Sequence, residues 1–503
     1  MRNRMTIVVW LVLGLSMTAA FAASDVPPAK AENLSPAVHE FVSHHKIEIG
    51  KEVLNYTAVA GEIILTDREG SPAASLFSIS YFKDGVTNAA ARPITFLFNG
   101  GPGSSAVWLH LGAFGPQRLN LSSDPTNPGG PPYELRDNPH TLLRYSDLVF
   151  VDPIGTGYSR ALGKAKAADY WGVDEDSASI AQFIRSFLTK NKRWNSPKYL
   201  TGESYGTIRA SLLVRDLELR LLDSVALNGV ILLSSAVDER TFITAGPANE
   251  LPFVTNLPTY AATAAYHNAL PEHPQDLDGF LKEARAFAGT EYLTALFMGD
   301  ALPENQAREI ARKLHHFTGL SEDYLIRSHL RVDAGRFLKE LLRGRAQTLA
   351  EHDTRFLGKD PDEAGESVVY DPFLFGIAGP FVAAFNSYLV TLDVKMDSPY
   401  ITLSYEAGQS WKKGSGRWSE GFLYTADNLA AAAVTNKDFR VFVASGLHDL
   451  TTSFFGTEYV FSHSGIPKDR ITLRNYFGGH MMYLYEPSLE QMSADIGSFI
   501  AGK

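Results

Sequence analysis

The chain has 503 residues, of which 45% are hydrophobic and 20% are charged, and its formal net charge is −10. This balance is typical of a globular protein with a large core, and an acidic chain without a basic block argues against nucleic acid as a partner. There are no cysteines, which excludes disulfide bonds, thiolate metal sites and a lipid anchor on cysteine.

The first 22 residues have the pattern of a secretory signal peptide. Arg2 and Arg4 form a positive start, Ile7 to Leu15 are apolar, and Ala20-Phe21-Ala22 fits a small-x-small cleavage site. An uncleaved membrane anchor is the alternative, although the apolar run is short for a span. Cleavage would change the net charge to −12, because the segment holds two arginines and no acidic residue. We therefore expect a secreted protein, periplasmic in a Gram-negative source, with no stable membrane anchor.

After the expected cleavage site, the chain begins with a flexible leader and continues as strands. Residues 23–35 are rich in alanine and proline. Between residues 46 and 82 apolar and polar residues alternate, as they do from Leu76 to Phe82. This alternation predicts antiparallel strands at the edge of a sheet, at the start of a core that extends over residues 36–240.

From Pro93 onward the pattern becomes one of alternating strands and helices. Short apolar runs end in glycine-rich loops, and an amphipathic helix with acidic residues at its start is expected over 174–190. The expected buried strands are Ile94–Phe98, Leu148–Val151, Gly229–Leu233 and, after an interruption, Arg440–Ala444 and Arg470–Leu473. Such units predict an α/β fold of the α/β-hydrolase kind, with a mostly parallel central sheet flanked by helices and active-site loops at the carboxyl ends of the strands.

Residues 241–420 break this rhythm and predict a helix-rich cap inserted into the core. The expected helices are 271–287, 303–317 and 334–348. The apolar and aromatic residues of the insertion either wall the acyl side of the pocket or simply pack the cap. They include Phe253, Tyr260, Tyr266, Phe373, Phe375 and Trp411.

The pentapeptide Gly202-Glu203-Ser204-Tyr205-Gly206 lies between an apolar run and a helical pattern. A strand, a tight turn and a helix are the context that a nucleophile elbow requires. The two glycines lack a Cβ, so strand and helix can close on the turn and leave the Ser204 hydroxyl exposed. A glycine-bracketed surface turn is the alternative for the pentapeptide alone, but its context favours a catalytic serine.

The core resumes over residues 421–503 and supplies candidates for a base and its partner. Asp449 and His480 each follow one of the last two expected strands, and His480 lies in a glycine-rich loop. A serine nucleophile needs a base, and the base needs an acid that fixes its tautomer. The order Ser204, Asp449, His480 is that of an α/β-hydrolase triad, with His448 as the less favoured alternative base.

The glycine-rich turn Asn99–Ser105 follows the first buried strand. The oxyanion of a tetrahedral intermediate needs backbone N–H donors, of which Tyr205, after the nucleophile, can supply one and this turn the second. A phosphate-binding loop is the alternative for the turn, but the lysine and the serine or threonine that such a loop carries are missing.

Five blocks of residues together resemble the serine carboxypeptidases, and in particular a secreted bacterial member of that family. The blocks are Asn99–Ser105, Asp152–Ser159, Gly202–Gly206, Gly446–Asp449 and Gly479–Met481, in order along the chain. The resemblance implies that Ser204 is the nucleophile, His480 the base and Asp449 the acid that orients it.

The same resemblance implies roles in binding. Gly101 and Tyr205 would donate N–H groups to the oxyanion. Asn99 and Glu203 would hold the C-terminal carboxylate of the substrate, and Met481 would border the pocket of the leaving residue.

Two departures from the family pattern bear on substrate recognition. Members carry a cysteine in the Gly-Pro-Gly segment and several disulfides, whereas this chain has no cysteine. A second glutamate is expected where Ala113 stands. We therefore expect Asn99 and Glu203 alone to hold the carboxylate, with about tenfold discrimination (about 1.4 kcal/mol) between free-carboxyl and amide substrates.

These patterns predict a serine-type carboxypeptidase that cleaves C-terminal residues from peptides through an acyl-enzyme. Acidic pH should favour it, because Glu203 must hold a proton to hydrogen-bond a carboxylate. Peptides are the expected substrates, and no metal or organic cofactor is implied. One alternative is an esterase or acyltransferase with the same triad, since other nucleophiles can attack the acyl-enzyme. Another is a catalytically idle binding protein on this fold.

Overall fold

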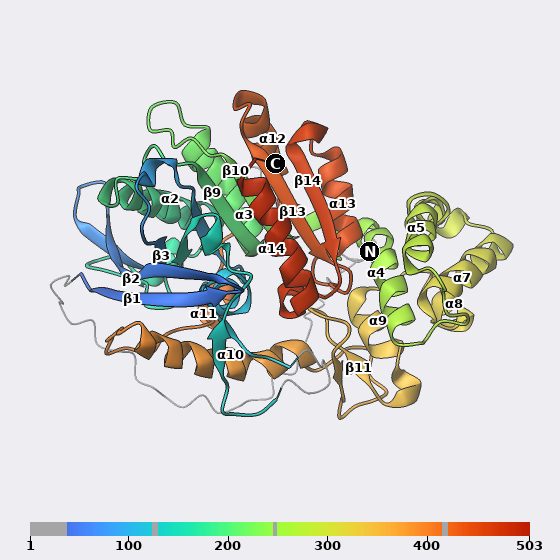
Figure 1. The fold of residues 1–503 in the computed structure, drawn as a ribbon. Coiled ribbons are helices and arrows are strands. Elements are labelled where there is room, and N and C mark those ends of the chain that lie inside the picture. The colour runs from blue at the N-terminus through green and yellow to red at the C-terminus, as the bar shows by residue number, and fades with distance from the viewer. Residues whose placement is uncertain (1–37, 123–128, 245–248, 415–420, 503) are drawn as a thin grey trace, which may run out of the picture. The chain divides into compact units, whose positions relative to one another are not determined.

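A ten-stranded sheet organises the part of the chain that the structure describes (Figure 1). The computed structural model describes residues 38–122, 129–244, 249–414 and 421–502, so the expected signal peptide and leader lie outside the described residues. The strands of this sheet are β1 (Glu40–Ile49), β2 (Glu52–Thr66), β3 (Pro72–Lys83), β4 (Ile94–Phe98), β7 (Asp147–Val151), β8 (Arg160–Ala161), β9 (Lys198–Ser204), β10 (Gly229–Ser235), β13 (Arg440–Gly446) and β14 (Ile471–Tyr476). Their order is β1-β2-β3-β7-β4-β9-β10-β13-β14, and β8 pairs with β3.

Strand direction divides the sheet into two parts. β1, β2, β3 and β7 pair antiparallel, whereas β7, β4, β9, β10, β13 and β14 pair parallel. The residues account for this difference, because β2 alternates between buried and exposed positions while β4 and β7 are buried throughout. An α/β fold with a mostly parallel sheet and antiparallel strands at one edge is thereby confirmed.

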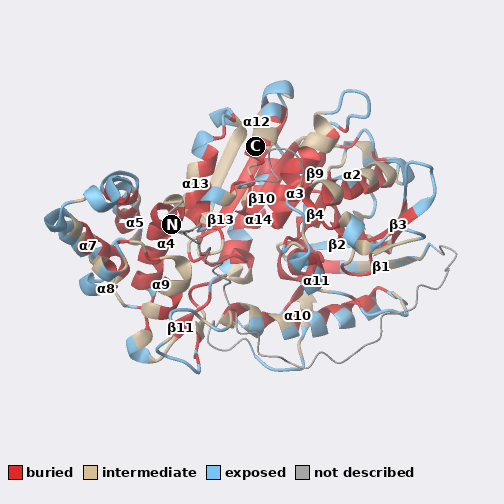
Figure 2. Ribbon diagram, turned by 180° about the vertical axis from the view of Figure 1, so that it is seen from behind, coloured by how far each residue is buried: buried red, intermediate tan, exposed pale blue. Residues whose placement is uncertain are grey.

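Helices cover both faces of the parallel part of the sheet. One face is covered by α2 (Val173–Lys190), α3 (Tyr205–Leu213), α12 (Ala426–Thr435) and α13 (Phe454–His463). The other face is covered by α1 (Val107–Leu109), α10 (Pro372–Thr391) and α14 (Glu486–Ile500). Successive side chains of β4 alternate between these two layers. Phe96 and Phe98 belong to the buried cluster on the side of α2 and α3, whereas Leu97 belongs to the cluster on the side of α10 and α14. The buried residues along these strands and helices are coloured red in Figure 2.

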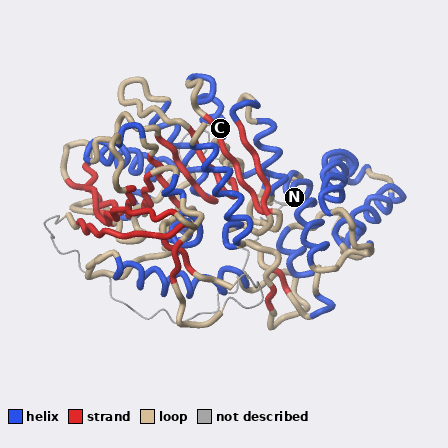
Figure 3. The backbone as a smooth tube through the Cα atoms, in the orientation of Figure 1, coloured by secondary structure: helices blue, strands red, loops and turns tan. Residues whose placement is uncertain are grey.

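The chain between β10 and β13 adds no strand to the main sheet and falls into two parts. The first part has its own hydrophobic cluster, and its helices are α4 (Leu251–Tyr266), α5 (Leu277–Phe287), α6 (Leu293–Met298), α7 (Glu304–Thr318), α8 (Glu322–Arg327) and α9 (Ala334–Glu340). The second part contains α10 and α11 (Tyr405–Gln409), and α10 shares the buried cluster of the sheet instead. Only the first part of the insertion is therefore a helical module with a hydrophobic cluster of its own; Figure 3 draws its helices in blue, like all other helices.

Within the insertion, one predicted helix is shorter than expected and another helix is unusually apolar. The helix predicted over 334–348 is too long: α9 ends at Glu340, Ala346 has a left-handed backbone, and β11 (Thr348–Leu349) pairs with β12 (Leu357–Gly358). Among the described helices, α10 alone is long and apolar enough to cross a membrane by length and composition. Its inner face packs on the core, which accounts for much of its apolar composition.

Outside the insertion, a further small antiparallel sheet joins β5 (Gln117–Leu119) and β6 (Leu135–Asp137).

Candidate active site

The chain turns sharply where β9 meets α3, and Ser204 lies at this turn. Its backbone φ is +58°, a value that a non-glycine residue rarely adopts. A Cβ at Gly202 would lie 2.0 Å from the carbonyl oxygen of Gly206, and one at Gly206 would lie 2.6 Å from that of Phe98. The close approach of strand, helix and neighbouring loop therefore holds Ser204 in the strained geometry of a nucleophile elbow.

Asp449 and His480 meet because β13 and β14 are parallel neighbours whose following loops leave the same edge of the sheet. Nδ1 of His480 lies 2.9 Å from Oδ2 of Asp449. Burial acts to lower the pKa of His480, but Asp449 opposes this effect and the pKa is raised overall. Because Nδ1 is engaged by the carboxylate, Nε2 is the nitrogen available to a reacting group.

Asp449 is itself held by several donors. The backbone N–H groups of Thr451 and Thr452 donate to Oδ1 at 2.9 and 3.0 Å, and the Thr452 hydroxyl donates to Oδ2 at 2.7 Å. These bonds satisfy a carboxylate that is completely buried. They fix the orientation of Asp449 and, through it, that of His480.

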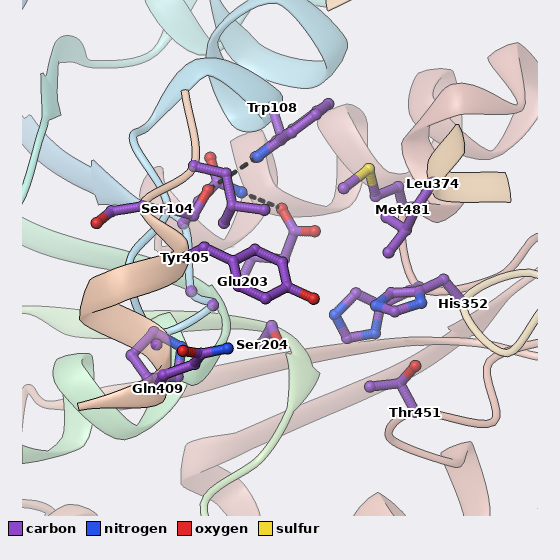
Figure 4. Close-up of a pocket in the computed structure, with 18 residues that line it drawn as sticks. Ser104, Trp108, Glu203, Ser204, His352, Leu374, Tyr405, Gln409, Thr451 and Met481 are labelled. Atoms are coloured by element: carbon purple, nitrogen blue, oxygen red, sulfur yellow. Dashed lines mark hydrogen bonds between the residues drawn. The ribbon is translucent and has the colours of Figure 1, made fainter. Parts of the chain in front are cut away.

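One pocket of about 360 Å³ brings the predicted site residues together. Figure 4 shows Glu203, Ser204 and His352 facing this pocket. Six of the predicted residues line it: Asn99, Gly101, Glu203, Ser204, His480 and Met481. The other two are adjacent, since Asp449 is bonded to His480 and Tyr205 follows Ser204 as the first residue of α3.

The turn after β4 lies directly against the elbow. A Cβ at Gly100 would come within 2.5 Å of the backbone nitrogen of Tyr205 and 2.9 Å of the Cβ of Ser204. Gly101 has φ +100°, which glycine adopts readily, and lines the pocket beside Ser204. The turn therefore brings the backbone of Gly100 against Ser204 and Tyr205, with Gly101 as the next residue along the chain.

Asn99, Glu203 and Tyr483 form a buried cluster next to the elbow. Nδ2 of Asn99 donates to Oε2 of Glu203 at 2.6 Å (dashed to Glu203 in Figure 4), and the Tyr483 hydroxyl donates to the same oxygen at 2.8 Å. Burial raises the pKa of Glu203 to about 7, against the opposing effects of His480, Tyr483 and Asn99. A carboxyl group that keeps its proton near neutral pH can donate a hydrogen bond to a bound carboxylate.

A family model matches the part of the chain that carries the nucleophile. It is the serine carboxypeptidase family, matched over residues 69–245. The chain is 30% identical over 129 residues to serine carboxypeptidase-like 45 of Arabidopsis thaliana, covering 25% of each chain. It is 35% identical over 120 residues to a pheromone-processing carboxypeptidase of Cryptococcus gattii, covering 24% of this chain and 17% of that one. The chain thus spans a quarter or less of the length of these curated relatives.

A solved structure agrees over a longer stretch. The crystal structure of a prohormone-processing carboxypeptidase from Saccharomyces cerevisiae superposes with a TM-score of 0.53 at 16% identity, covering 89% of this chain and 91% of that one. This similarity confirms the α/β-hydrolase fold predicted from the sequence.

The position where a second glutamate was expected has no polar side chain. Ala113 is buried in the π-helical turn His110–Phe114. Its neighbour Gly112 lies against Tyr483, because a Cβ there would come 2.8 Å from Cε2 of that ring. The structure instead adds Tyr483 as a third member of the cluster that Asn99 and Glu203 form.

Among the residues that were not singled out from the sequence, Tyr483 and His352 make the most specific contacts with the predicted site. Tyr483 lies three residues after His480, and this proximity was the available signal. His352 comes from the insertion: it lines the pocket, its Nδ1 lies 2.9 Å from Oδ2 of Asp371, and its ring centroid lies 5.2 Å from that of His480. Nothing in the sequence near His352 distinguishes it.

His448, the alternative base, has a different environment. It is buried against the rings of Tyr266 and Phe477, and burial lowers its pKa well below the ordinary value. It does not line the pocket, and Asp449 pairs with His480 instead. Across the described residues, no group of three or more histidine, aspartate or glutamate side chains is arranged to hold a metal ion.

The insertion reaches the pocket through residues other than the predicted aromatic set. None of the six residues given as examples, Phe253, Tyr260, Tyr266, Phe373, Phe375 and Trp411, lines it, although other apolar and aromatic residues of the insertion do. Phe253 and Tyr260 pack inside the helical module, where burial of large aromatic rings is most favourable. The insertion instead supplies Leu374, Leu403 and Tyr405 to the pocket.

A short segment of the insertion, residues 351–354, is bonded to both catalytic loops. The N–H of His480 donates to the carbonyl of His352, and the N–H of Gly479 donates to the Asp353 carboxylate at 3.1 Å. On the other loop, Leu450 N–H donates to the Glu351 carbonyl, and Thr354 N–H donates to the carbonyl of His448, both at 3.0 Å. The insertion therefore helps to position the proposed base.

Proposed function

We propose that this protein is a serine carboxypeptidase that removes C-terminal residues from peptides through an acyl-enzyme. The observation that carries the proposal is Glu203: a buried carboxyl group adjoins the nucleophile, lines the same pocket and has its pKa raised to about 7. Such a group can hydrogen-bond a free carboxylate, whereas hydrolysis of a neutral ester needs no such donor.

In this mechanism the Ser204 hydroxyl attacks the scissile carbonyl while Nε2 of His480 takes the hydroxyl proton. The N–H groups of Gly101 and Tyr205 stabilise the oxyanion, each by ~3 kcal/mol. His480 then gives the proton to the leaving amine as the C–N bond breaks, which leaves the acyl group on Ser204. Water attacks the ester by the same route, and Asp449 stays ionised throughout and holds the imidazole.

Two titrations with opposite requirements set the pH dependence. Binding needs Glu203 protonated, because two ionised carboxylates in contact repel each other. The base needs His480 neutral, and the pKa of His480 is raised above its usual value. KM should therefore rise as pH increases through about 7, while kcat falls at the acid end.

The decisive experiment compares a peptide that has a free C-terminal carboxyl with the same peptide as its C-terminal amide. We expect at least about tenfold higher kcat/KM for the free acid, together with labelling of Ser204 by a fluorophosphonate. Equal kcat/KM for acid and amide would favour an esterase or acyltransferase. Absence of labelling at Ser204 would favour the catalytically idle binding protein.

We also propose that the protein is exported and acts on peptides outside the cytoplasm. The proposal is supported by the charged start, apolar stretch and small-x-small site within residues 1–22. Mass spectrometry of the mature protein should find Ala23 at its N-terminus, and retention of Met1 would contradict export by cleavage.

A further inference from the structure

Tyr483 is held rigidly against the carboxyl cluster. Its side chain is fully buried, and its ring lies over Gly112, where there is no room for a Cβ. The Arg118 guanidinium donates to the carbonyls of both Gly112 and Tyr483, at 3.2 and 3.1 Å. The phenol therefore has one position, 2.8 Å from Oε2 of Glu203.

Asn99 is fixed just as firmly, and it uses the same oxygen of Glu203. The backbone N–H of Leu109 donates to Oδ1 of Asn99 at 3.0 Å, which settles the orientation of the amide. Its Nδ2 must then be the group that faces Oε2 of Glu203, at 2.6 Å. Oε2 thus accepts two hydrogen bonds, whereas no bond to Oε1 is found among the described residues.

This asymmetry determines where the proton of neutral Glu203 sits. A proton on Oε2 would face the Asn99 amide, which can only donate, and it would require the Tyr483 hydroxyl to accept a bond instead of donating one, so Oε2 is the poorer site for a proton. The proton is therefore on Oε1, and Glu203 lines the pocket.

We propose that Tyr483 is a positioning residue for recognition of the substrate carboxylate: with Asn99 it holds the Glu203 proton on Oε1, so that the carboxyl group presents an O–H donor to a free carboxylate. This inference rests on the proposed function. The ligand class is a carboxylate, because a neutral amide oxygen does not require Glu203 to be protonated.

Removal of the phenol should have two effects on carboxylate binding. The proton is then free to move to Oε2, so fewer molecules present the donor and KM rises even at acidic pH. The hydrogen bond from Tyr483 favours ionised Glu203, so its loss raises the pKa of Glu203 further. The pH range in which KM increases therefore moves to higher pH. A purely structural role would raise KM without moving its pH dependence.

The test is Tyr483→Phe in the full chain, with KM and kcat measured from pH 4 to 8.5 on the free-acid peptide and its amide. We expect KM for the free acid to rise about fivefold at acidic pH, with the climb displaced to higher pH and with kcat and the KM for the amide unchanged. The matched control is Tyr476→Phe, which removes a buried phenol 2.7 Å from the Asp495 carboxylate outside the pocket. It should leave both profiles unchanged.

A second background separates this inference from the proposed function. In Glu203→Gln, which has no carboxyl proton to place, adding Tyr483→Phe should cause no shift in the pH dependence of KM. If the parent enzyme hydrolyses the free acid but Tyr483→Phe keeps its KM profile, or raises KM equally for acid and amide, the role of Tyr483 is refuted. If the parent hydrolyses neither peptide, the proposed function fails. The role of Tyr483 is then tested by titration calorimetry, which measures binding of the free-acid peptide to Ser204→Ala with and without Tyr483→Phe. An affinity that Tyr483→Phe leaves unaltered at every pH would refute the role of Tyr483.

Discussion

Two buried carboxyl groups, Glu203 in the pocket and Asp449 beside it, lie in opposite environments. Asp449 accepts four hydrogen bonds spread over both of its oxygens, from two backbone N–H groups, a hydroxyl and His480. Glu203 accepts two bonds, both on Oε2, and its pKa is raised to about 7 by burial. Burial is thus common to both carboxyl groups, and the number and placement of donors decide which one can serve as a fixed negative charge.

The difference also separates two tasks. In the proposed function, a negative charge at Asp449 supports the imidazolium that forms on His480 during catalysis. A proton on Glu203 would in turn allow it to bind an anionic substrate group. Changes to the first carboxyl group should therefore act on kcat, and changes to the second should act on KM and on the pH dependence of stability.

The largest effects should follow from loss of the groups that react. Ser204→Ala and His480→Ala are each expected to lower kcat by about 10⁶, and the double variant by little more, because the residues act as a unit. Steady-state hydrolysis of the free-acid peptide measures this. More than a trace of turnover in Ser204→Ala would show that another residue is the nucleophile.

Asp449→Asn tests the charged carboxyl group directly. The amide keeps the shape of the side chain but favours the wrong tautomer of His480, so kcat should fall by about 10⁴ with KM nearly unchanged. A loss confined to KM would contradict the division of tasks between Asp449 and Glu203. The folded state of the variant is checked by its thermal unfolding.

Glu203 should leave a signature in stability that does not depend on turnover. Its folded pKa of about 7 lies above an unfolded value of about 4.3, so protonation stabilises the folded state by about 4 kcal/mol below pH ~4.3, and this contribution is lost as pH rises through 7. Urea unfolding of the parent and of Glu203→Gln across this range should show the difference between them shrinking by that amount. A difference independent of pH would mean that Glu203 is ionised throughout.

The smallest effect concerns binding of the substrate. In the parent, KM for a free-acid peptide should rise roughly tenfold over the first one to one and a half pH units above 7, because only protonated Glu203 binds it. Glu203→Gln should flatten this rise without abolishing turnover, since its amide remains a donor at every pH. The amide substrate is the control. A variant whose KM climbs as the parent's does would remove Glu203 from carboxylate recognition.

The sequence was most informative where a function depends on neighbouring residues. The buried strands were predictable because runs such as Ile94–Phe98 are apolar except for Thr95. The elbow was predictable because its glycines flank Ser204. The bond between Tyr483 and Glu203 joins residues 280 positions apart, and nothing local specifies it. The extra length predicted for α9 has another cause, since helical periodicity extends beyond the point where the backbone turns at Ala346.

The bonds between residues 351–354 and the two catalytic loops bear on how this architecture can change over evolutionary time. The helices α5 to α8 pack within their own cluster and bring no residue to the pocket, so they can diverge, shorten or be exchanged with little consequence for the chemistry. The 351–354 segment has no such freedom, because its backbone holds the loops of Asp449 and His480. A natural or engineered truncation that removes this segment, and His352 with it, but keeps the other pocket-lining residues would leave the loops of Asp449 and His480 without these bonds, and we expect a folded, inactive relative.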